Sequence, residues 1–164
     1  RIKTSESIVK KLRRHGYEST IENMVKYVND IAGIRVICSF TSDIYRIAEM
    51  IRLQNDIHVI AVKDYIRLPK ASGYKSYHMV VTIPIYLTEG PVETKVEIQI
   101  RTIAMDFWAS LEHKLRYKKD IPAETADAIA KQLQDCAEVV ARTDKQMYDI
   151  RKQIEASGVK AGVE

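Results

Sequence analysis

The sequence has few cysteines and no long apolar run, and each absence excludes a class of protein. The two cysteines, Cys38 and Cys136, lie far apart and match no paired-cysteine metal motif. We therefore expect two buried free thiols in a reducing cytoplasm. No segment approaches the roughly 18 apolar residues of a membrane span, and no signal-peptide pattern is present, so we expect no membrane association.

Length, composition and charge indicate a single globular domain with a basic N-terminal segment. The 164 residues fit one domain, and 46% hydrophobic residues are enough to build a core, which argues against disorder. The net charge is +4, but residues 1–14 contain six basic side chains and one acidic side chain, a local charge of +5. Such a block attracts an anion. Because the basic segment includes the first residue, Arg1, and no methionine precedes it, we expect a further segment upstream.

Hydrophobic periodicity predicts an α+β fold with a mixed, largely antiparallel sheet flanked by helices. Gly16 is placed to cap the first helix, and residues 88–91 to form the turn between the last two strands, which we expect to be antiparallel. The last helix is long, and residues 157–164 are expected to form a flexible tail. The expected helices cover residues 4–15, 20–29, 41–54, 103–118 and 122–156, and the expected strands cover residues 31–40, 57–64, 77–86 and 93–102.

The segment from Lys63 to His78 is the most informative part of the sequence. It places four basic side chains, three tyrosines and a histidine around Gly73. Basic side chains neutralise phosphate, and a tyrosine beside a flexible glycine can stack on a base. The segment therefore predicts a nucleotide site. Its basic residues are Lys63, Arg67, Lys70 and Lys75.

The basic N-terminal helix has a regular stripe of polar side chains. Lys3, Ser7, Lys11 and Arg14 follow at intervals of four, four and three, which places them on one helical face. A row of cations with one hydroxyl can hold a polyphosphate chain. The same stripe is also compatible with a solvated basic face.

Two acidic residues stand at positions where a carboxylate could take part in chemistry. Asp30 precedes the strand at 31–40, where small residues allow close approach, although an ordinary cap is compatible with its position. Glu97 lies at the centre of the strand at 93–102, opposite the core-facing set and equally compatible with a solvent-facing position. Two carboxylates on one sheet surface would suit Mg²⁺. Val96, Ile98 and Ile100 are expected to face the core, and Lys95, Glu97, Gln99 and Arg101 to share the opposite face.

Apolar side chains on the last two helices predict packing surfaces. In the helix at 103–118, Trp108 and its apolar neighbours Phe107, Leu111 and Leu115 are expected in the core. The apolar spacing of the long helix suits packing against a partner helix, or equally against its own domain. Its apolar residues are Ile129, Leu133, Cys136, Val140, Met147, Ile150 and Ile154.

Four segments together resemble the synthetase domain of the RelA/SpoT family, whose enzymes make the alarmones ppGpp and pppGpp. They are RIKTSESIVKKLRR, DIAGIRVICSF, KDYIRLPKASGYKSYH and VEIQIRTIAMDFWASLEHKLRYK, which occur in the family's order between Arg1 and about Lys118. The resemblance implies a nucleotidyltransferase-like catalytic domain over residues 1–120. It also implies a helical extension over residues 121–156, the character of a small stand-alone synthetase, and a homotetramer.

The resemblance also implies a reaction, in which the β,γ-diphosphate of ATP moves to the 3′-hydroxyl of GDP or GTP and leaves AMP. Asp30 and Glu97 match the two acidic residues of the active site, expected to hold Mg²⁺, with Glu97 also the general base. Tyr74 matches the tyrosine that stacks on guanine. The residues expected at ATP are Arg1 and Arg35, which sandwich adenine, and Lys3, Ser7, Lys11 and Arg14, which bind phosphate. The residues expected near the acceptor nucleotide are Lys70, Lys75, His78, Gln99 and Glu112.

Two positions depart from patterns within the family. Long bifunctional members have an Arg-x-Lys-Asp motif where this chain has Ala61-Val62-Lys63-Asp64, so metal preferences tied to that motif are not transferred. In a branch activated by alarmone, asparagine precedes the Phe-Trp pair. Here Asp106 precedes it, and its negative charge is expected to disfavour a phosphorylated effector.

Two other functions are compatible with the same residues. A non-catalytic module could use the basic and aromatic segment to bind single-stranded RNA, although such a binder has little use for Asp30 and Glu97. A nucleotidyltransferase of similar fold would move AMP and release pyrophosphate.

Overall fold

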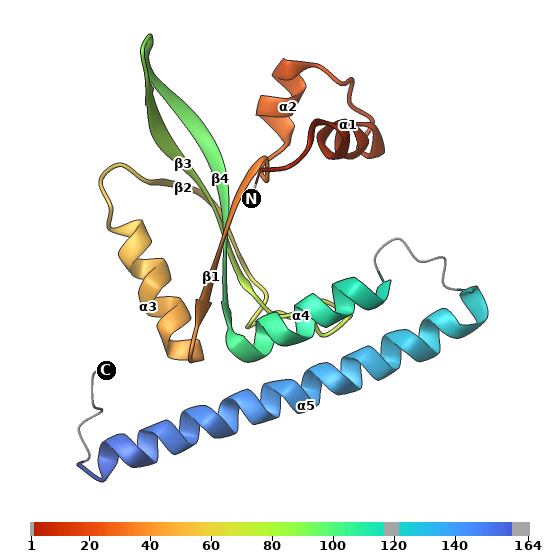
Figure 1. Cartoon of the computed structure of the whole chain (residues 1–164), viewed down its shortest axis with the longest axis vertical. Coiled ribbons are helices and arrows are strands. Elements are labelled where there is room, and N and C mark those ends of the chain that lie inside the picture. Colours follow the sequence, from red (N-terminus) through yellow and green to blue (C-terminus); the bar gives the residue numbers. More distant parts are fainter. Residues whose placement is uncertain (1, 117–121, 159–164) are drawn as a thin grey trace. The chain divides into compact units, whose positions relative to one another are not determined.

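The computed structural model describes residues 2–116 and 122–158 (Figure 1). Its order of elements is the predicted one: helix, helix, strand, helix, three strands, helix, helix. The helices are α1 (Ser5–Arg14), α2 (Ile21–Tyr27), α3 (Thr41–Arg52), α4 (Ile103–Arg116) and α5 (Ala123–Ala156). The strands are β1 (Ala32–Cys38), β2 (His58–Asp64), β3 (Tyr77–Leu87) and β4 (Gly90–Thr102).

The chain forms two compact units. The first contains the segment up to Val36, Tyr45–Asp64 and Tyr77–Ile100. The second contains Ile37–Ile44, Tyr65–Ser76 and the segment from Arg101 onward. The predicted division at residue 120 stays a prediction, and the predicted tail lies outside the described residues from 159 onward.

The sheet confirms the predicted α+β class. Its four strands have the order β1-β4-β3-β2, and they form a mixed sheet. β3 is antiparallel to both β2 and β4, and the register of β3 with β4 pairs Tyr77 with Ile100 and Val80 with Glu97. The predicted antiparallel pairing of the last two strands is therefore confirmed, and the long β3–β4 hairpin is visible in Figure 1.

α1 begins and ends where its capping residues predict. The side chain of Thr4 accepts a hydrogen bond from the backbone of Ser7 at the N-terminus. At the C-terminus, Gly16 has φ 77°, and the N–H groups of Gly16 and Tyr17 donate to the carbonyls of Arg13 and Leu12. This is the glycine-dependent C-cap expected from the sequence. Ile8 and Leu12 lie buried with Val28, as the period of the helix requires.

The central part of β4 has the expected alternation, with one exception at its end. Val96, Ile98 and Ile100 are buried, whereas Glu97 is partly exposed. Arg101 was expected on the polar face, outside the core, but it is only 5% exposed. Its burial is compensated by polar partners within the second unit, described below.

α4 and α5 run side by side in the second unit (Figure 1). Trp108 and Leu133 lie buried in their shared core, and the indole Nε1 donates a hydrogen bond to the Leu133 carbonyl at 3.0 Å. The prediction for Trp108 is therefore confirmed. The same prediction is wrong for its neighbours, because α4 turns them away from α5. Phe107, Leu111 and Leu115 are 58%, 43% and 53% exposed.

The two cysteines differ in their environments. Cys38 is buried, as predicted, but Cys136 is exposed, because the buried positions Leu133 and Ala137 define the packed face of α5 and Cys136 lies off it. Both are free thiols. Within the described ranges, no helix is long and apolar enough to cross a membrane.

Candidate active site

Asp30 forms ion pairs with two lysines in the first unit. Lys3 and Lys11 both donate to its carboxylate, Lys11 at 2.7 Å. Lys3 precedes the helix, because α1 starts at Ser5, so its expected place on the helical stripe is wrong. Its backbone N–H instead donates to the Ile31 carbonyl at 2.8 Å. This extended pairing brings Lys3 to the same carboxylate that Lys11 reaches from the helix.

The electrostatics of Asp30 follow from this pairing. Burial raises the pKa of the Asp30 carboxyl, but hydrogen bonds and charges from Lys11 and Lys3 outweigh it, so the pKa lies below its ordinary value. The carboxylate is therefore ionised, and the side-chain ammonium groups of Lys3 and Lys11 lie beside it. A polyphosphate would compete with Asp30 for these two cations.

The other residues predicted at ATP are less buried. Ser7 is exposed in the first turn of α1, where its hydroxyl accepts a hydrogen bond from Thr4 at 2.9 Å. Arg14 is exposed in the last turn of α1, and Arg35 is exposed on β1. All three belong to the first unit with Asp30. Arg1 lies outside the described residues.

Glu97 lies among polar side chains of the sheet. His78 Nδ1 is 3.3 Å from Glu97 Oε1, and Gln99 Nε2 donates to Glu97 Oε2 at 2.9 Å. His78 and Gln99 are directly paired across β3 and β4, and alternation along β4 places Gln99 on the same face as Glu97. The structure thus brings three predicted site residues into one hydrogen-bonded group.

The charge of Glu97 is set by these neighbours. The hydrogen bond with His78 lowers the pKa of the Glu97 carboxyl most, burial opposes it, and the hydrogen bond from Gln99 lowers it further. The negative charge of Asp30 also acts on Glu97 and raises its pKa, which opposes the two hydrogen bonds.

Asp30 and Glu97 are the two carboxylates that the sequence predicts as ligands of Mg²⁺. Mg²⁺ usually takes one or two protein carboxylates and completes its octahedron with waters and substrate phosphates. Among the described residues, no group of three or more His, Cys, Asp and Glu side chains could hold a metal ion by itself. Two carboxylates agree in number and chemistry with a Mg²⁺ that substrate phosphates also hold.

The predicted guanine-stacking residue, Tyr74, is packed within the second unit. Its ring contacts the buried α4–α5 core and makes an edge contact with Tyr65, with ring centroids 5.9 Å apart. Lys70 Nζ lies 4.8 Å from its centroid, and Arg101 donates a hydrogen bond to its hydroxyl. Lys75 and the half-buried Glu112 of α4 belong to the same unit.

Sequence reasoning missed the role of Arg101. Its guanidinium donates to Ser76 Oγ at 3.2 Å and pairs with Asp106 at 3.1 Å, besides its contact with Tyr74. The charge of Asp106 is therefore paired with a buried cation. The five-residue separation of Arg101 and Asp106 across a strand–helix junction was a signal, but Ser76 comes from a distant segment that local spacing does not reveal.

Comparisons with known proteins decide the family. The model described as "Region found in RelA / SpoT proteins" matches residues 1–122. The chain belongs to the RelA/SpoT family. Among the RelA/SpoT relatives, GTP pyrophosphokinase YwaC of Bacillus subtilis is 46% identical over 157 residues, which are 94% of this chain and 73% of that protein. GTP pyrophosphokinase YjbM of the same organism is 39% identical over 155 residues, 94% of this chain and 71% of that protein.

Solved structures of RelA/SpoT relatives agree in fold. Small alarmone synthetase 1 from Bacillus subtilis, bound to its product pppGpp, gives a TM-score of 0.85 at 39% identity, covering 95% of this chain and 77% of that one. Small alarmone synthetase 2 from the same organism gives a TM-score of 0.81 at 44% identity, and the match covers 93% of this chain and 78% of that one. Both coverages include the region of the long helix α5, so the likeness extends beyond the segment matched by the family model.

Proposed function

We propose that this chain is a GTP pyrophosphokinase that transfers the β,γ-diphosphate of ATP to the 3′-hydroxyl of GDP or GTP, releasing AMP and ppGpp or pppGpp. The observation that carries the proposal is the 46% identity, over 94% of the chain, to a protein named for this activity. The arrangement of Asp30 and Glu97 supports it, because phosphoryl-type transfer needs fixed cations, a base and little covalent chemistry.

On the donor side, the basic segment binds the phosphates of ATP. Lys3 and Lys11 exchange their pairing with Asp30 for pairing with phosphate oxygens, and Ser7 and Arg14 extend the same surface along α1. The guanidinium planes of Arg1 and Arg35 stack on adenine. Holding the triphosphate in one orientation fixes the β-phosphorus for attack.

Glu97 takes the proton of the acceptor. Its ionised carboxylate, oriented by His78 and Gln99, accepts the proton of the 3′-hydroxyl. The 3′-oxygen then bonds to the β-phosphorus, and the bond between that phosphorus and the bridging oxygen to the α-phosphorus breaks, so AMP leaves with the bonding electrons. Asp30 and Glu97 are proposed to hold Mg²⁺, which would neutralise charge on the transferred phosphates.

On the acceptor side, Tyr74 stacks on guanine, and Lys70, Lys75 and Glu112 contact the same nucleotide. The ammonium group of Lys70 already lies over the ring of Tyr74. Guanine that stacks on the face covered by Lys70 would displace this lysine from the ring toward phosphate. His78 and Gln99 are proposed to contact the acceptor as well as Glu97.

We propose that the chain forms a homotetramer and that α4 provides part of the interface. Ile103, Phe107, Leu111 and Leu115 follow at intervals of four and are all at least 43% exposed. A stripe of four large apolar side chains is larger than the scattered exposed residues of ordinary monomers. The cytoplasmic location expected from the sequence stays a prediction.

Product analysis tests the function directly. Incubation with ATP, Mg²⁺ and GDP or GTP, followed by anion exchange, should give equal amounts of AMP and a guanosine tetra- or pentaphosphate. Release of pyrophosphate instead would indicate a nucleotidyltransferase. Absence of any nucleotide product from folded protein, with RNA binding preserved or strengthened in Asp30→Asn and Glu97→Gln, would support the RNA-binding module.

A further inference from the structure

The segment Tyr65–Ser76, here called the acceptor loop, is tied together at its base and at its tip. At the base, the Tyr65 N–H donates to the Ser76 carbonyl at 3.0 Å. At the tip, the Gly73 N–H donates to the Lys70 carbonyl at 2.8 Å, and the Lys70 N–H donates to the Tyr74 carbonyl at 3.2 Å. A loop with joined ends and a hydrogen-bonded tip behaves as one compact element. Its position therefore decides where the side chains of Lys70, Tyr74 and Lys75 lie.

The tip of the acceptor loop packs directly on α5. Gly73 has φ +84°, and a Cβ added to it would lie 2.5 Å from the Cβ of Ala137 and 3.6 Å from the Cα of Gln134. The first distance is far shorter than any real contact between carbon atoms. The contact therefore exists only because residue 73 has no side chain and residue 137 has a small one.

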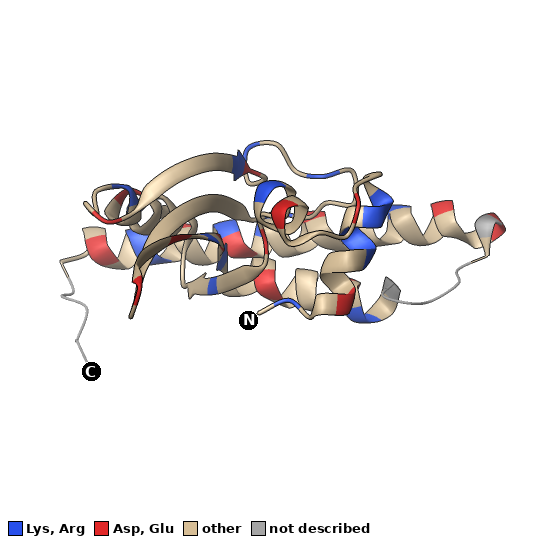
Figure 2. Ribbon diagram, turned by 90° about the horizontal axis from the view of Figure 1, so that it is seen from above, with Lys and Arg blue, Asp and Glu red and all other residues tan. Residues whose placement is uncertain are grey.

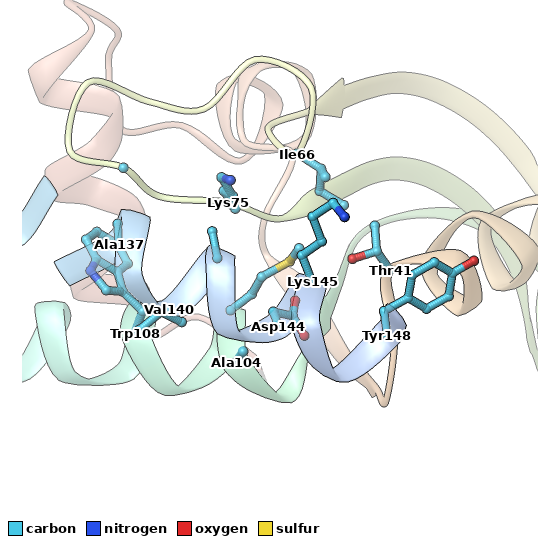
Figure 3. Close-up of a pocket in the computed structure, with 13 residues that line it drawn as sticks. Thr41, Ile66, Lys75, Ala104, Trp108, Ala137, Val140, Asp144, Lys145 and Tyr148 are labelled. Atoms are coloured by element: carbon cyan, nitrogen blue, oxygen red, sulfur yellow. The ribbon is translucent and has the colours of Figure 1, made fainter. Parts of the chain in front are cut away.

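Beside this contact lies a cavity of about 290 Å³, lined by the acceptor loop, α4, α5 and Thr41 of α3 (Figure 3). Figure 3 shows Ala137, Val140 and Trp108 on one side, with Lys75 of the loop across from them. Because side chains do not fill this space, the loop is not supported along its whole length. The packing of Gly73 and Tyr74 on α5 and its core therefore fixes the loop.

We infer that Ala137 is a positioning residue for the acceptor nucleotide, acting through Gly73 on the loop that presents Tyr74. The kinetic consequence rests on the proposed function, whereas the structural consequence concerns the loop alone. Ala137 contacts the loop, and it is not among the residues proposed to bind either nucleotide. A change in its size is therefore expected to alter binding of GDP or GTP and to leave binding of ATP unchanged.

A pair of compensating substitutions tests this contact. Gly73→Ala adds the methyl group that clashes, and Ala137→Gly removes the methyl group that it meets. Gly73→Ala should raise the KM for GDP about tenfold, the equivalent of about 1.4 kcal/mol, without changing the KM for ATP. The double variant should recover to within about threefold of the wild type, not fully, because the positive φ remains unfavourable for alanine.

The matched control combines Gly73→Ala with Ala128→Gly, an exposed alanine of the same helix. Both partner substitutions place glycine in α5 and weaken the helix similarly, but only Ala137→Gly makes room at residue 73. Equal recovery in the two double variants would overturn the inference. Ala137→Val, which adds bulk from the helix side, should raise the KM for GDP in the same direction even if Gly73→Ala folds poorly.

A second readout needs no catalysis. Trypsin cleaves after Lys70 and Lys75, and the cleavage rate reports how often the acceptor loop leaves α5. Cleavage at these two sites should be faster in Gly73→Ala and return toward the wild-type rate with Ala137→Gly. Unchanged cleavage in Gly73→Ala would refute the positioning role. Failure of the wild type to form AMP would refute the proposed function, and the cleavage rates would still decide the role of Ala137.

Discussion

Thr102 donates a hydrogen bond from its hydroxyl to the carboxylate of Asp144 at 2.7 Å, which ties the end of β4 to α5. Thr102 is fully buried, and its oxygen also accepts from the Met105 N–H in the first turn of α4 at 3.2 Å. Burial raises the pKa of the Asp144 carboxyl, and the Thr102 hydrogen bond and the charge of Lys75 oppose it only in part. This carboxylate is therefore held in an environment that disfavours its charge.

Asp144→Asn should make the protein more stable at neutral pH. Since the folded-state pKa of Asp144 lies above the unfolded value, its contribution to stability is full below the unfolded pKa and is lost as pH rises through the folded pKa. An amide keeps an oxygen acceptor for Thr102 and does not ionise. Urea unfolding across a pH series should show the stability difference, variant minus wild type, growing with pH over that window.

The control for charge removal on the same helix is Asp135→Asn, at an exposed position of α5. If the stability difference between Asp144→Asn and the wild type shrinks as pH rises, the protein stabilises the charged form of the carboxylate. This result would contradict the expected effect of burial.

Glu97→Gln should abolish turnover while leaving nucleotide binding in place. The amide keeps the shape of the side chain and cannot accept the 3′-hydroxyl proton, so kcat should fall by about 10²–10⁴-fold. AMP formation measures turnover, and titration with a fluorescent ATP analogue measures binding. Glu93→Gln, at an exposed position of the same strand, is the matched control and should retain turnover. Substantial turnover in Glu97→Gln would transfer the role of the base to another group.

His78→Phe should move the acid limb of the pH–rate profile to higher pH. The hydrogen bond with His78 is the largest cause of the lowered pKa of Glu97, so its loss raises the pH at which the base becomes ionised. The profile of kcat/KM against pH reports this ionisation in the free enzyme. His78→Gln, which keeps a hydrogen-bond donor, should shift the limb less. An acid limb that stays in place in His78→Phe would show that the pair does not tune the base.

Phe107→Glu should reduce the oligomer to smaller species. Phe107 is 58% exposed at the centre of the apolar stripe of α4, and a buried charge without a partner would destabilise the interface. Light scattering coupled to size exclusion measures the mass against the 18.8 kDa of one chain. Leu53→Glu, at a 71% exposed position outside α4, is the control and should keep the wild-type mass. A monomeric wild type would refute the tetramer.

The parts of the fold that were predicted correctly have local causes. The alternation of Val96, Ile98 and Ile100 gives the buried face of β4, and Gly16 gives the end of α1. Phe107 shows the limit of this reasoning. Apolar spacing on α4 identifies an apolar face, but it does not say whether that face packs within the chain or is exposed, as Phe107 is.

The site shows the same limit. The spacing of Lys11 with Ser7 and Arg14 follows from the helix, but Lys3 reaches Asp30 from an extended segment that pairs with Ile31. Helical spacing does not reveal where the helix starts. Asp30 and Glu97 were candidates from their positions in the sequence, and the family resemblance gave them roles, whereas their hydrogen-bonding partners required the tertiary structure.

The charges of α5 indicate what its exposed surface can contact. Figure 2 shows both acidic and basic residues along this helix. A continuous basic track, as used to follow a nucleic-acid backbone, is absent from its described length. Mixed charge of this kind suits a solvated helix or a protein contact instead.

The two ion pairs of Asp30 affect how strongly ligands of different negative charge bind to Lys3 and Lys11. Asp30 already neutralises part of the charge of Lys3 and Lys11 before an anionic ligand arrives. Binding of the ligand therefore replaces ion pairs with Asp30 by ion pairs with the ligand. The net gain is the difference between the two sets, and a single phosphate offers little more than the carboxylate that it displaces. A triphosphate chain offers several charges at once. Under the proposed function, this intramolecular competitor would make the donor site discriminate ATP from AMP, its own product, and would weaken product inhibition without any contact that recognises AMP.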